Sequence, residues 1–409
     1  MLVRLLLKLY FVTIGFVSAF AITPILPIPL VVGLLMPSAF FFSAPGGQKV
    51  KLKQEMSLVN GLFYIFLLII LGSFFLQNLG LGYSDKALRH LFSYFSVVLV
   101  FFYIVFFALT LSGIEYKDVF KFIAMGVLLT SIFTIAEFAA KNYSHVGAVL
   151  DQVTFQEPYE PLYFINGMSF IRARGTAGES GHFAMYLVMF SPFAFYYYAW
   201  MRKRAKLTLI FLLTMLALML TFSAAAFLSV SFSLLVTACC YLYRAKRNKV
   251  KKYLLVITTC AGFIILTMIV NNSYGILDAV ISKLTFTDVY SAQDRLRRWG
   301  GAVELIAQKP LLGWGPGISS LLNDTGIVNL YLELLSQIGI IGFAIWSFIL
   351  LTFGRMILKI RGNVCYVFLF SFIAGLVHYA AISNYWFPWL WSLFALITYH
   401  YGCQPADAQ

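Results

Sequence analysis

The sequence predicts an all-α protein that crosses a membrane about twelve times and forms a single integral membrane domain over residues 1–409. Its residues are 61% hydrophobic and only 11% charged, and the mean hydropathy is +0.85. A soluble domain is about 45–50% apolar and about 25% charged. At about 20 residues per helix, twelve spans use about 240 residues and leave room for two large loops. This composition excludes a water-soluble globular protein, a disordered chain and a disulfide scaffold.

Apolar runs separated by polar residues give the positions of the predicted spans. They lie near 5–22, 25–44, 58–77, 91–111, 119–140, 181–201, 207–221, 224–243, 253–270, 328–351, 364–382 and 385–402. The segments 207–243 and 364–402 are each too long for one crossing, so each is predicted to be a helical hairpin. Prolines follow the first run directly, which favours an uncleaved hairpin over a signal peptide.

The basic residues predict that both ends of the chain lie in the cytoplasm. With that orientation most of the 30 Lys and Arg residues fall in inside segments, as the positive-inside rule requires. The net charge of +14 therefore reflects membrane orientation, and we expect no nucleic-acid partner. The two longest loops, 141–180 and 271–327, then share the outer face. Both contain arginines although they face away from the cytoplasm, which makes them candidate site segments.

The first outer loop ends in a run of chemically active residues at the entrance to a span. Arg172, Arg174, Glu179 and His182 lie here together with three glycines. A guanidinium matches phosphate geometry with paired donors, glycine allows close approach of the backbone to a ligand, and a carboxylate or imidazole can transfer a proton. The run predicts a site for an anionic headgroup. The alternative is a solvated loop whose arginines contact lipid phosphates.

The second outer loop contains a predicted amphipathic helix over 292–308, which Pro310 follows. One helical face carries Arg295, Arg298 and Ala302, and Leu296, Trp299, Gly300, Val303 and Ala307 form an apolar stripe. Such a helix is expected to lie along the membrane boundary, with Arg295 and Arg298 at the height of the headgroups and Arg297 between them in sequence. The alternative is a structural role, with an ion pair between Asp294 and Arg298.

Two features follow this helix. The glycine-rich segment 310–317 could hold a ligand through backbone N–H groups, but such a segment is more typical of a turn. In the next span Asn329, Glu333 and Gln337 fall on one helical face. A carboxylate within a span is costly unless it faces protein or a cavity, so Glu333 either serves a site or ties two helices together. The other buried polar candidates are Glu137, His378 and Asn384.

Metal and nucleotide motifs are missing from the sequence. It has no Asp-x-Asp, Walker loop, Gly-x-Ser-x-Gly or His-rich metal helix. We therefore expect neither a metal ion nor a cofactor.

Several short motifs, in their order along the chain, resemble the bacterial O-antigen polymerase/ligase superfamily, the membrane glycosyltransferases that use undecaprenyl-diphosphate glycans. They are the Arg-x-Arg-Gly-Thr run that continues to 184, Thr-Phe-Ser at 221–223, Arg295-x-x-x-Trp299-x-x-Ala302, the glycine motif at 310–317, and Asn329-x-Tyr331-Leu332 with Gly339. In the ligase branch a catalytic histidine commonly precedes the last motif, where this chain has Val328. The family often has an arginine after Thr-Phe-Ser, where this chain has Ala224. The lack of the histidine favours the polymerase branch.

The resemblance implies a fold like that of the C-type glycosyltransferases (GT-C), with the active site on the periplasmic face of the bacterial inner membrane. It implies a polysaccharide polymerase of lipopolysaccharide biosynthesis, which transfers a glycan from undecaprenyl diphosphate to a lipid-linked repeat unit without a metal. The expected partners are these lipid-linked oligosaccharides, membrane lipids and a chain-length regulator protein. The alternatives are a ligase that acts on a lipid or protein acceptor, and, from another class, a transporter or flippase for lipid-linked sugars.

The resemblance and the residue chemistry together assign roles to eleven residues. The diphosphate-binding residues are expected to be Arg172, Arg174, Arg295, Arg297 and Arg298. Glu179 is the first choice as catalytic base, with His378 and Glu333 as second choices. His182, Asn329 and Tyr331 are expected to line the substrate cavity.

Overall fold

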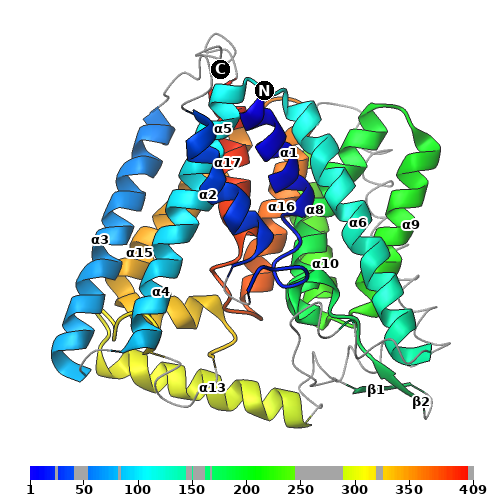
Figure 1. Cartoon of the computed structure of the whole chain (residues 1–409). Helices are drawn as coiled ribbons and strands as arrows, with labels where there is room; N and C mark the ends of the chain where they lie inside the picture. The colour runs from blue at the N-terminus through cyan, green and yellow to red at the C-terminus, as the bar shows by residue number, and fades with distance from the viewer. Residues whose placement is uncertain are drawn as a thin grey trace.

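The computed structural model describes residues 1–23, 26–40, 54–81, 84–143, 150, 162–165, 168–244, 289–318 and 326–403. This part of the chain is mostly helical, and it includes one antiparallel hairpin of two strands, β1 (Leu162–Ile165) and β2 (Met168–Ile171). Most helices run along a common direction, whereas α13 (Val289–Gln308) lies across the end of the bundle away from both termini (Figure 1). The predicted helix at 292–308 is thus present and begins three residues earlier.

The other helices follow the predicted apolar runs. They are α1 (Leu2–Thr13), α2 (Ile28–Phe40), α3 (Gln54–Leu81), α4 (Asp85–Ser96), the π-helical η1 (Val97–Ile104), α5 (Val105–Ser112), α6 (Tyr116–Tyr143), the 3₁₀ turn η2 (Gly175–Ala177), α8 (Ser180–Trp200), α9 (Arg204–Leu220), α10 (Ala224–Arg244), α15 (Leu330–Lys359), α16 (Val364–Tyr379) and α17 (Pro388–Gly402). Each of the two segments predicted to be a hairpin divides into two helices, α9 and α10 in the first and α16 and α17 in the second.

Within the described residues, five helices are long and apolar enough to cross a membrane, judged by length and composition. They are Gln54–Gly80, Asp85–Ser112, Tyr116–Tyr143, Ala224–Arg244 and Leu330–Lys359. The apolar helices α2 and α16 are shorter. The predicted span at 253–270 lies outside the described residues, so the total of about twelve spans stays a prediction.

The first predicted span, 5–22, is wrong in its second half. Helix α1 ends at Thr13, and Phe16 N donates to the Thr13 carbonyl at 2.7 Å in a turn. The Ile14 carbonyl accepts instead from the indole Nε1 of Trp389, at 2.9 Å. Contacts made far along the chain therefore override the apolar pattern, which by itself favours a continuous helix.

Helix α17 forms the centre of the bundle. Almost all of its residues are buried, as expected for a helix that is apolar on every side. Phe394 stacks on Phe353 of α15 with ring centroids 3.9 Å apart, and Trp391 packs against both Phe63 of α3 and Trp346 of α15. This aromatic packing fixes α3 and α15 against the core.

Helix α15 is broken at Gly339, where φ is 62° and ψ is −171°. The carbonyls of Ser336 and Gln337 accept from Trp314 N and Gly315 N, both at 2.8 Å. In return, Ile340 N and Ile341 N donate to the carbonyls of residues 310 and 311, at 2.8 and 3.2 Å. The segment 310–315 therefore supplies the backbone partners that the break removes, as irregular backbone within a membrane protein requires.

Candidate functional site

The segment that contains Arg172 and Arg174 is fixed between α6 and the turn that joins α9 to α10. Asn142 of α6 bonds the backbone of Ile171 twice, accepting from its N at 2.8 Å and donating to its carbonyl at 3.0 Å. Arg172 Nε donates to the Thr221 carbonyl at 2.9 Å, and Ala173 N donates to the Leu220 carbonyl at 3.0 Å. The motif at 221–223 thus lies directly beside the motif that begins at Arg172.

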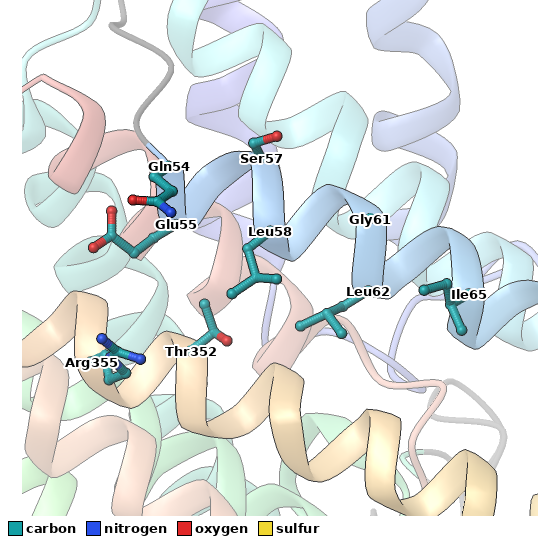
Figure 2. Close-up of a pocket in the computed structure, with 9 residues that line it drawn as sticks. All are labelled: Gln54, Glu55, Ser57, Leu58, Gly61, Leu62, Ile65, Thr352 and Arg355. Atoms are coloured by element: carbon teal, nitrogen blue, oxygen red, sulfur yellow. The ribbon is translucent and has the colours of Figure 1, made fainter.

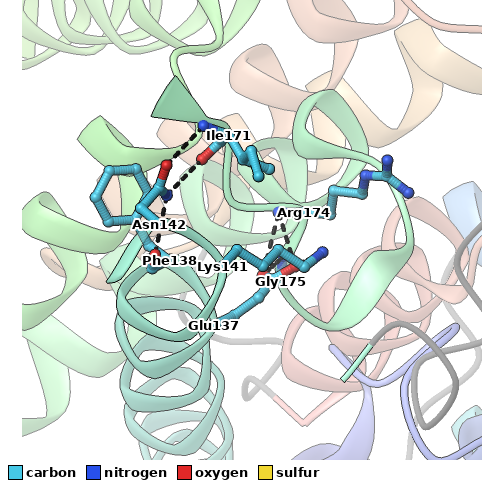
Figure 3. Close-up of polar contacts among 7 residues, drawn as sticks. All are labelled: Glu137, Phe138, Lys141, Asn142, Ile171, Arg174 and Gly175. Atoms are coloured by element: carbon cyan, nitrogen blue, oxygen red, sulfur yellow. Dashed lines mark hydrogen bonds and ion pairs between the residues drawn. The ribbon is translucent and has the colours of Figure 1, made fainter. Parts of the chain in front are cut away.

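The backbone at Arg174 and Gly175 binds a carboxylate of the protein itself. Arg174 N and Gly175 N donate to Glu137 Oε2 at 3.1 and 2.6 Å, and Lys141 Nζ donates to Glu137 Oε1 at 2.9 Å. Figure 3 shows the Arg174 side chain directed away from Glu137. The sequence indicates Glu137 only as a buried candidate and gives no role to Lys141. The signal for both was the i, i+4 spacing of opposite charges near the end of a span.

Two histidines, His182 of α8 and His378 of α16, lie beside the segment that continues from Arg174 to Gly181. Buried His378, in the last turn of α16, has Nε2 2.9 Å from the Gly181 carbonyl and Nδ1 3.3 Å from Ser229 Oγ. A carbonyl can only accept, so Nε2 of His378 carries the proton in that bond. Buried His182 has Nε2 3.3 Å from Glu179 Oε2, and the Glu179 side chain is 67% exposed. Of the three expected bases, Glu179 therefore has an accessible carboxylate.

The arginines of α13 face the same region. Arg295 and Arg298 are half-buried on the face that contains buried Ala302, as predicted. Helix α13 packs against α15, and Asn329 at the start of α15 bonds the Ala380 carbonyl, two residues after His378. Arg298 Nη1 donates to the Gly326 carbonyl at 3.0 Å. The second outer loop thus approaches the histidines that the first loop contacts.

An acidic residue of α13 holds two of these arginines. Arg298 Nε donates to Asp294 Oδ2 at 2.7 Å, and Arg297 Nη2 donates to Asp294 Oδ1 at 2.9 Å. The hydrogen bonds from Arg298, together with those from Arg297, hold the pKa of Asp294 below its ordinary value. The ion pair expected under the structural alternative is therefore present. Arg297 is exposed, and Leu296 and Val303 of the apolar stripe are also exposed, on a different side of the helix from Ala302.

Asn329 and Tyr331 join the start of α15 to the end of α16. Asn329 Oδ1 accepts from Tyr331 N at 3.0 Å and from Leu332 N at 3.2 Å, which caps α15. Asn329 Nδ2 donates to the Ala380 carbonyl at 3.1 Å, and Tyr331 Oη donates to the Leu376 carbonyl at 2.6 Å. Val328, just before the cap, has a φ of 57°, which is rare for a β-branched residue.

Glu333 lies buried one turn further into α15. Its Oε1 accepts from Gln337 Nε2, and Gln337 Oε1 accepts from the hydroxyl of Tyr94 at 2.7 Å. This network ties α15 to α4, which was one of the two roles considered for Glu333. The predicted face with Asn329, Glu333 and Gln337 therefore serves helix packing over at least part of its length.

The glycine-rich segment 310–317 makes a structural contact with α15. The N–H groups of Trp314 and Gly315 bond the broken part of α15, and a Cβ on Gly313 would lie 2.4 Å from the backbone carbon of Gln337. Gly313 is therefore required for close approach of the two backbones. Across the described ranges, no group of three or more His, Cys, Asp or Glu residues could hold a metal ion.

Two of the hollows in the described residues lie apart from the arginines of the outer loops. One, of about 550 Å³, is almost entirely apolar and lies between α8, α9, α10 and α16. Another, of about 460 Å³, lies between α3 and α15, where Glu55, Thr352 and Arg355 face it (Figure 2). Glu55 bonds Lys359 and accepts from Tyr401 Oη at 2.9 Å. This second hollow is at the end of α3 close to the chain termini, opposite α13 (Figure 1).

Comparison with known proteins gives one family. A search of curated proteins finds no match to the chain. The family model for O-antigen ligase matches residues 209–347, a range that includes the 221–223 turn, α13, the glycine segment and the first part of α15. The match supports chemistry of the O-antigen ligase or polymerase type at a coarse level and does not distinguish the two branches. Over residues 209–347 the chain thus matches the O-antigen ligase family, which confirms the predicted resemblance to the O-antigen polymerase/ligase superfamily.

Proposed function

We propose that the protein is a polysaccharide polymerase that transfers a glycan from undecaprenyl diphosphate to a lipid-linked repeat unit, without a metal, at the periplasmic face of the bacterial inner membrane. The observation that carries the proposal is the approach of two arginine segments to His378. The segment with Arg172 and Arg174 continues to Gly181, whose carbonyl contacts His378. Arg298 of α13 bonds the Gly326 carbonyl, and a Cβ on Gly326 would lie 3.8 Å from the hydroxyl of Ser383, five residues after His378. A chain-length regulator protein is a further proposed partner.

The arginines of this region suit the leaving group of the proposed reaction. The bond between the anomeric carbon of the donor glycan and the diphosphate oxygen breaks, and its electron pair leaves with undecaprenyl diphosphate. Guanidinium groups of Arg174, Arg295 and Arg298 stabilise the charge that develops on the diphosphate. Arg172 and Arg297 support them from the same two segments. The positive charge replaces the Lewis acid that a metal-dependent enzyme uses at this step.

Glu179 completes the proposed chemistry as general base. Its exposed carboxylate takes the proton of the acceptor hydroxyl while the acceptor oxygen forms the new bond to the anomeric carbon. His182, whose Nε2 is 3.3 Å from Glu179 Oε2, orients this carboxylate. His378 is less suited because its Nε2 is occupied by the Gly181 carbonyl. Glu333 is less suited because its Oε1 is occupied by Gln337.

The proposal is tested by replacing arginines from each segment. Arg174→Ala and Arg295→Ala are each expected to abolish polymer while the protein level stays normal. Loss of one preorganised donor costs about 10²–10³ in rate. The control is Arg355→Ala, an exposed arginine at the hollow shown in Figure 2, which should leave polymer unchanged. Full-length polymer in both site variants would overturn the proposal.

Ligation is the second candidate, because the matched family model is that of an O-antigen ligase. A strain that lacks a ligase accumulates long lipid-linked chains, whereas a strain that lacks a polymerase shows single repeats. The flippase alternative is tested with purified protein and lipid-linked repeats in detergent. Polymer formed without a membrane gradient supports the polymerase, and an unchanged substrate supports transport.

A further inference from the structure

We infer that Glu137 is a positioning residue for the proposed reaction: its carboxylate binds the backbone at Arg174 and Gly175 and so fixes the direction of the Arg174 side chain. The inference rests on the proposed function, because it concerns the same arginine. Glu137 belongs to α6, whereas Arg174 precedes η2, so the contact joins two parts of the chain that are far apart in sequence.

The backbone at Arg174 has the geometry of an anion-binding nest. Arg174 is right-handed, with φ −97° and ψ −17°, and Gly175 is left-handed, with φ 61°. Successive residues of this kind direct their N–H groups toward one anion. Here that anion is the carboxylate of Glu137, with N–O distances of 3.1 and 2.6 Å. Any other residue at 175 would be strained, and its Cβ would lie 2.4 Å from Cγ of Phe183.

This arrangement separates the backbone of Arg174 from its side chain. Arg174 and Gly175 bond Glu137 through their backbone N–H groups, and the Arg174 side chain extends away from the carboxylate (Figure 3). Asn142, one residue beyond Lys141, holds Ile171 on the same segment. Two neighbouring parts of α6 therefore anchor the segment on both sides of Arg172, and Glu137 is the anchor at Arg174, the residue proposed to bind the diphosphate.

Burial of the charged Glu137–Lys141 pair costs free energy in a membrane protein. The two side chains are 0% and 1% exposed, and they lie near the end of a candidate membrane span. A buried ion pair of this kind often contributes less to stability than apolar residues of similar volume. Ionisable residues in spans are therefore expected to serve a function. Lys141 balances the charge of Glu137, and Glu137 supplies the acceptor that the nest needs.

The test measures steady-state kinetics of polymer formation with purified protein and lipid-linked repeat units. Because Glu137→Gln alone leaves the Lys141 charge buried, the main variant is Glu137→Gln with Lys141→Met, which removes both charges. We expect kcat to fall about 10- to 100-fold, because a misplacement of 1 Å can cost about 100-fold. KM for the repeat unit should change less than about threefold.

The matched control is Glu55→Gln with Lys359→Met. Glu55 and Lys359 form another glutamate–lysine pair. Glu55 lies at the start of α3, at the end of the bundle opposite α13, and loss of this pair should leave kcat within about twofold of wild type. Both double variants are also compared with wild type by thermal unfolding, so that a general loss of folding is recognised.

Arg174→Lys distinguishes positioning from a purely structural role. Lysine keeps the charge but loses the paired donors of arginine, so residual activity remains measurable. If Glu137 acts through Arg174, its removal in the Arg174→Lys background costs less than about threefold. The inference is overturned if removal of Glu137 lowers kcat by the same factor in the Arg174→Lys background as in wild type. It is also overturned if the main variant keeps the wild-type kcat. If wild-type protein makes no polymer at all, the proposed function itself fails.

Discussion

Gly339→Ala is expected to destabilise the protein strongly, because the break in α15 depends on a residue without a side chain. The backbone at 339 lies in a region that essentially only glycine adopts, and another residue there costs about 1–3 kcal/mol. A Cβ would also lie 2.3 Å from the Leu311 carbonyl oxygen, which is backbone and cannot move away cheaply.

The size of the destabilisation follows from the hydrogen bonds close to residue 339. Separation of residue 339 from residue 311 weakens the two hydrogen bonds nearest the clash, those donated by Ile340 N and Ile341 N. At a net value of about 1 kcal/mol per bond, their loss adds about 2 kcal/mol. The total of about 3–5 kcal/mol is a large part of the free energy of unfolding of an ordinary protein, about 5–15 kcal/mol.

The assay is the apparent melting temperature of the detergent-solubilised protein. At about 2 °C per kcal/mol for a large chain, Gly339→Ala should lower it by about 6–10 °C. The control is Gly72→Ala in α3, where a Cβ would meet no described atom within 4 Å. Alanine there should be neutral or stabilising by up to about 1 kcal/mol. Equal melting temperatures for the two variants would refute the steric reasoning.

Two smaller perturbations test the ends of α13 and α15. Asn329→Ala removes the cap of α15 and should lower the free energy of unfolding by about 1 kcal/mol, whereas Asn329→Ser should recover most of that loss. Thermal unfolding of both variants checks this prediction. A melting temperature of Asn329→Ala equal to that of wild type would contradict it. The lowered pKa of Asp294 means that its contribution to stability is present above its ordinary pKa of about 3.9 and is lost as the pH falls through the lower, folded-state pKa. Melting curves of wild type and Asp294→Asn should therefore differ slightly at about pH 6 and converge at about pH 2, and a difference that grows on acidification would contradict the assignment.

Sequence patterns predicted the features that depend on local periodicity. The division of 207–243 and 364–402 into two helices each, the helix at 292–308 and its face with Arg295 and Ala302 follow from spacing and length, and the structure has them. The order of short motifs predicted the resemblance to the O-antigen polymerase/ligase superfamily, which the match of the O-antigen ligase model at 209–347 supports. These features need no knowledge of how distant segments meet.

Features that depend on contacts between distant backbones were missed. The nest at Arg174 forms because Glu137 binds N–H groups about 37 residues away in sequence, and no residue pattern records backbone donors. The break at Gly339 is stable because residues 310–315 replace its lost hydrogen bonds. The glycines of that segment suggested ligand contact or a turn, and the sequence alone did not indicate that their partner is a helix.

The attachment of residues 310–315 to the break in α15 also gives α13 the geometry of a lever. Trp314, held by the break, donates through its indole Nε1 to the Leu305 carbonyl at 2.9 Å, so the carboxyl-terminal end of α13 is clamped. Arg295 lies ten residues before Leu305, or about 15 Å along the helix axis. A tilt of about 10° at the clamp would carry Arg295 through about 3 Å. Small changes in the packing around Trp314 would thus produce larger displacements in the amino-terminal half of α13, where the guanidinium groups are.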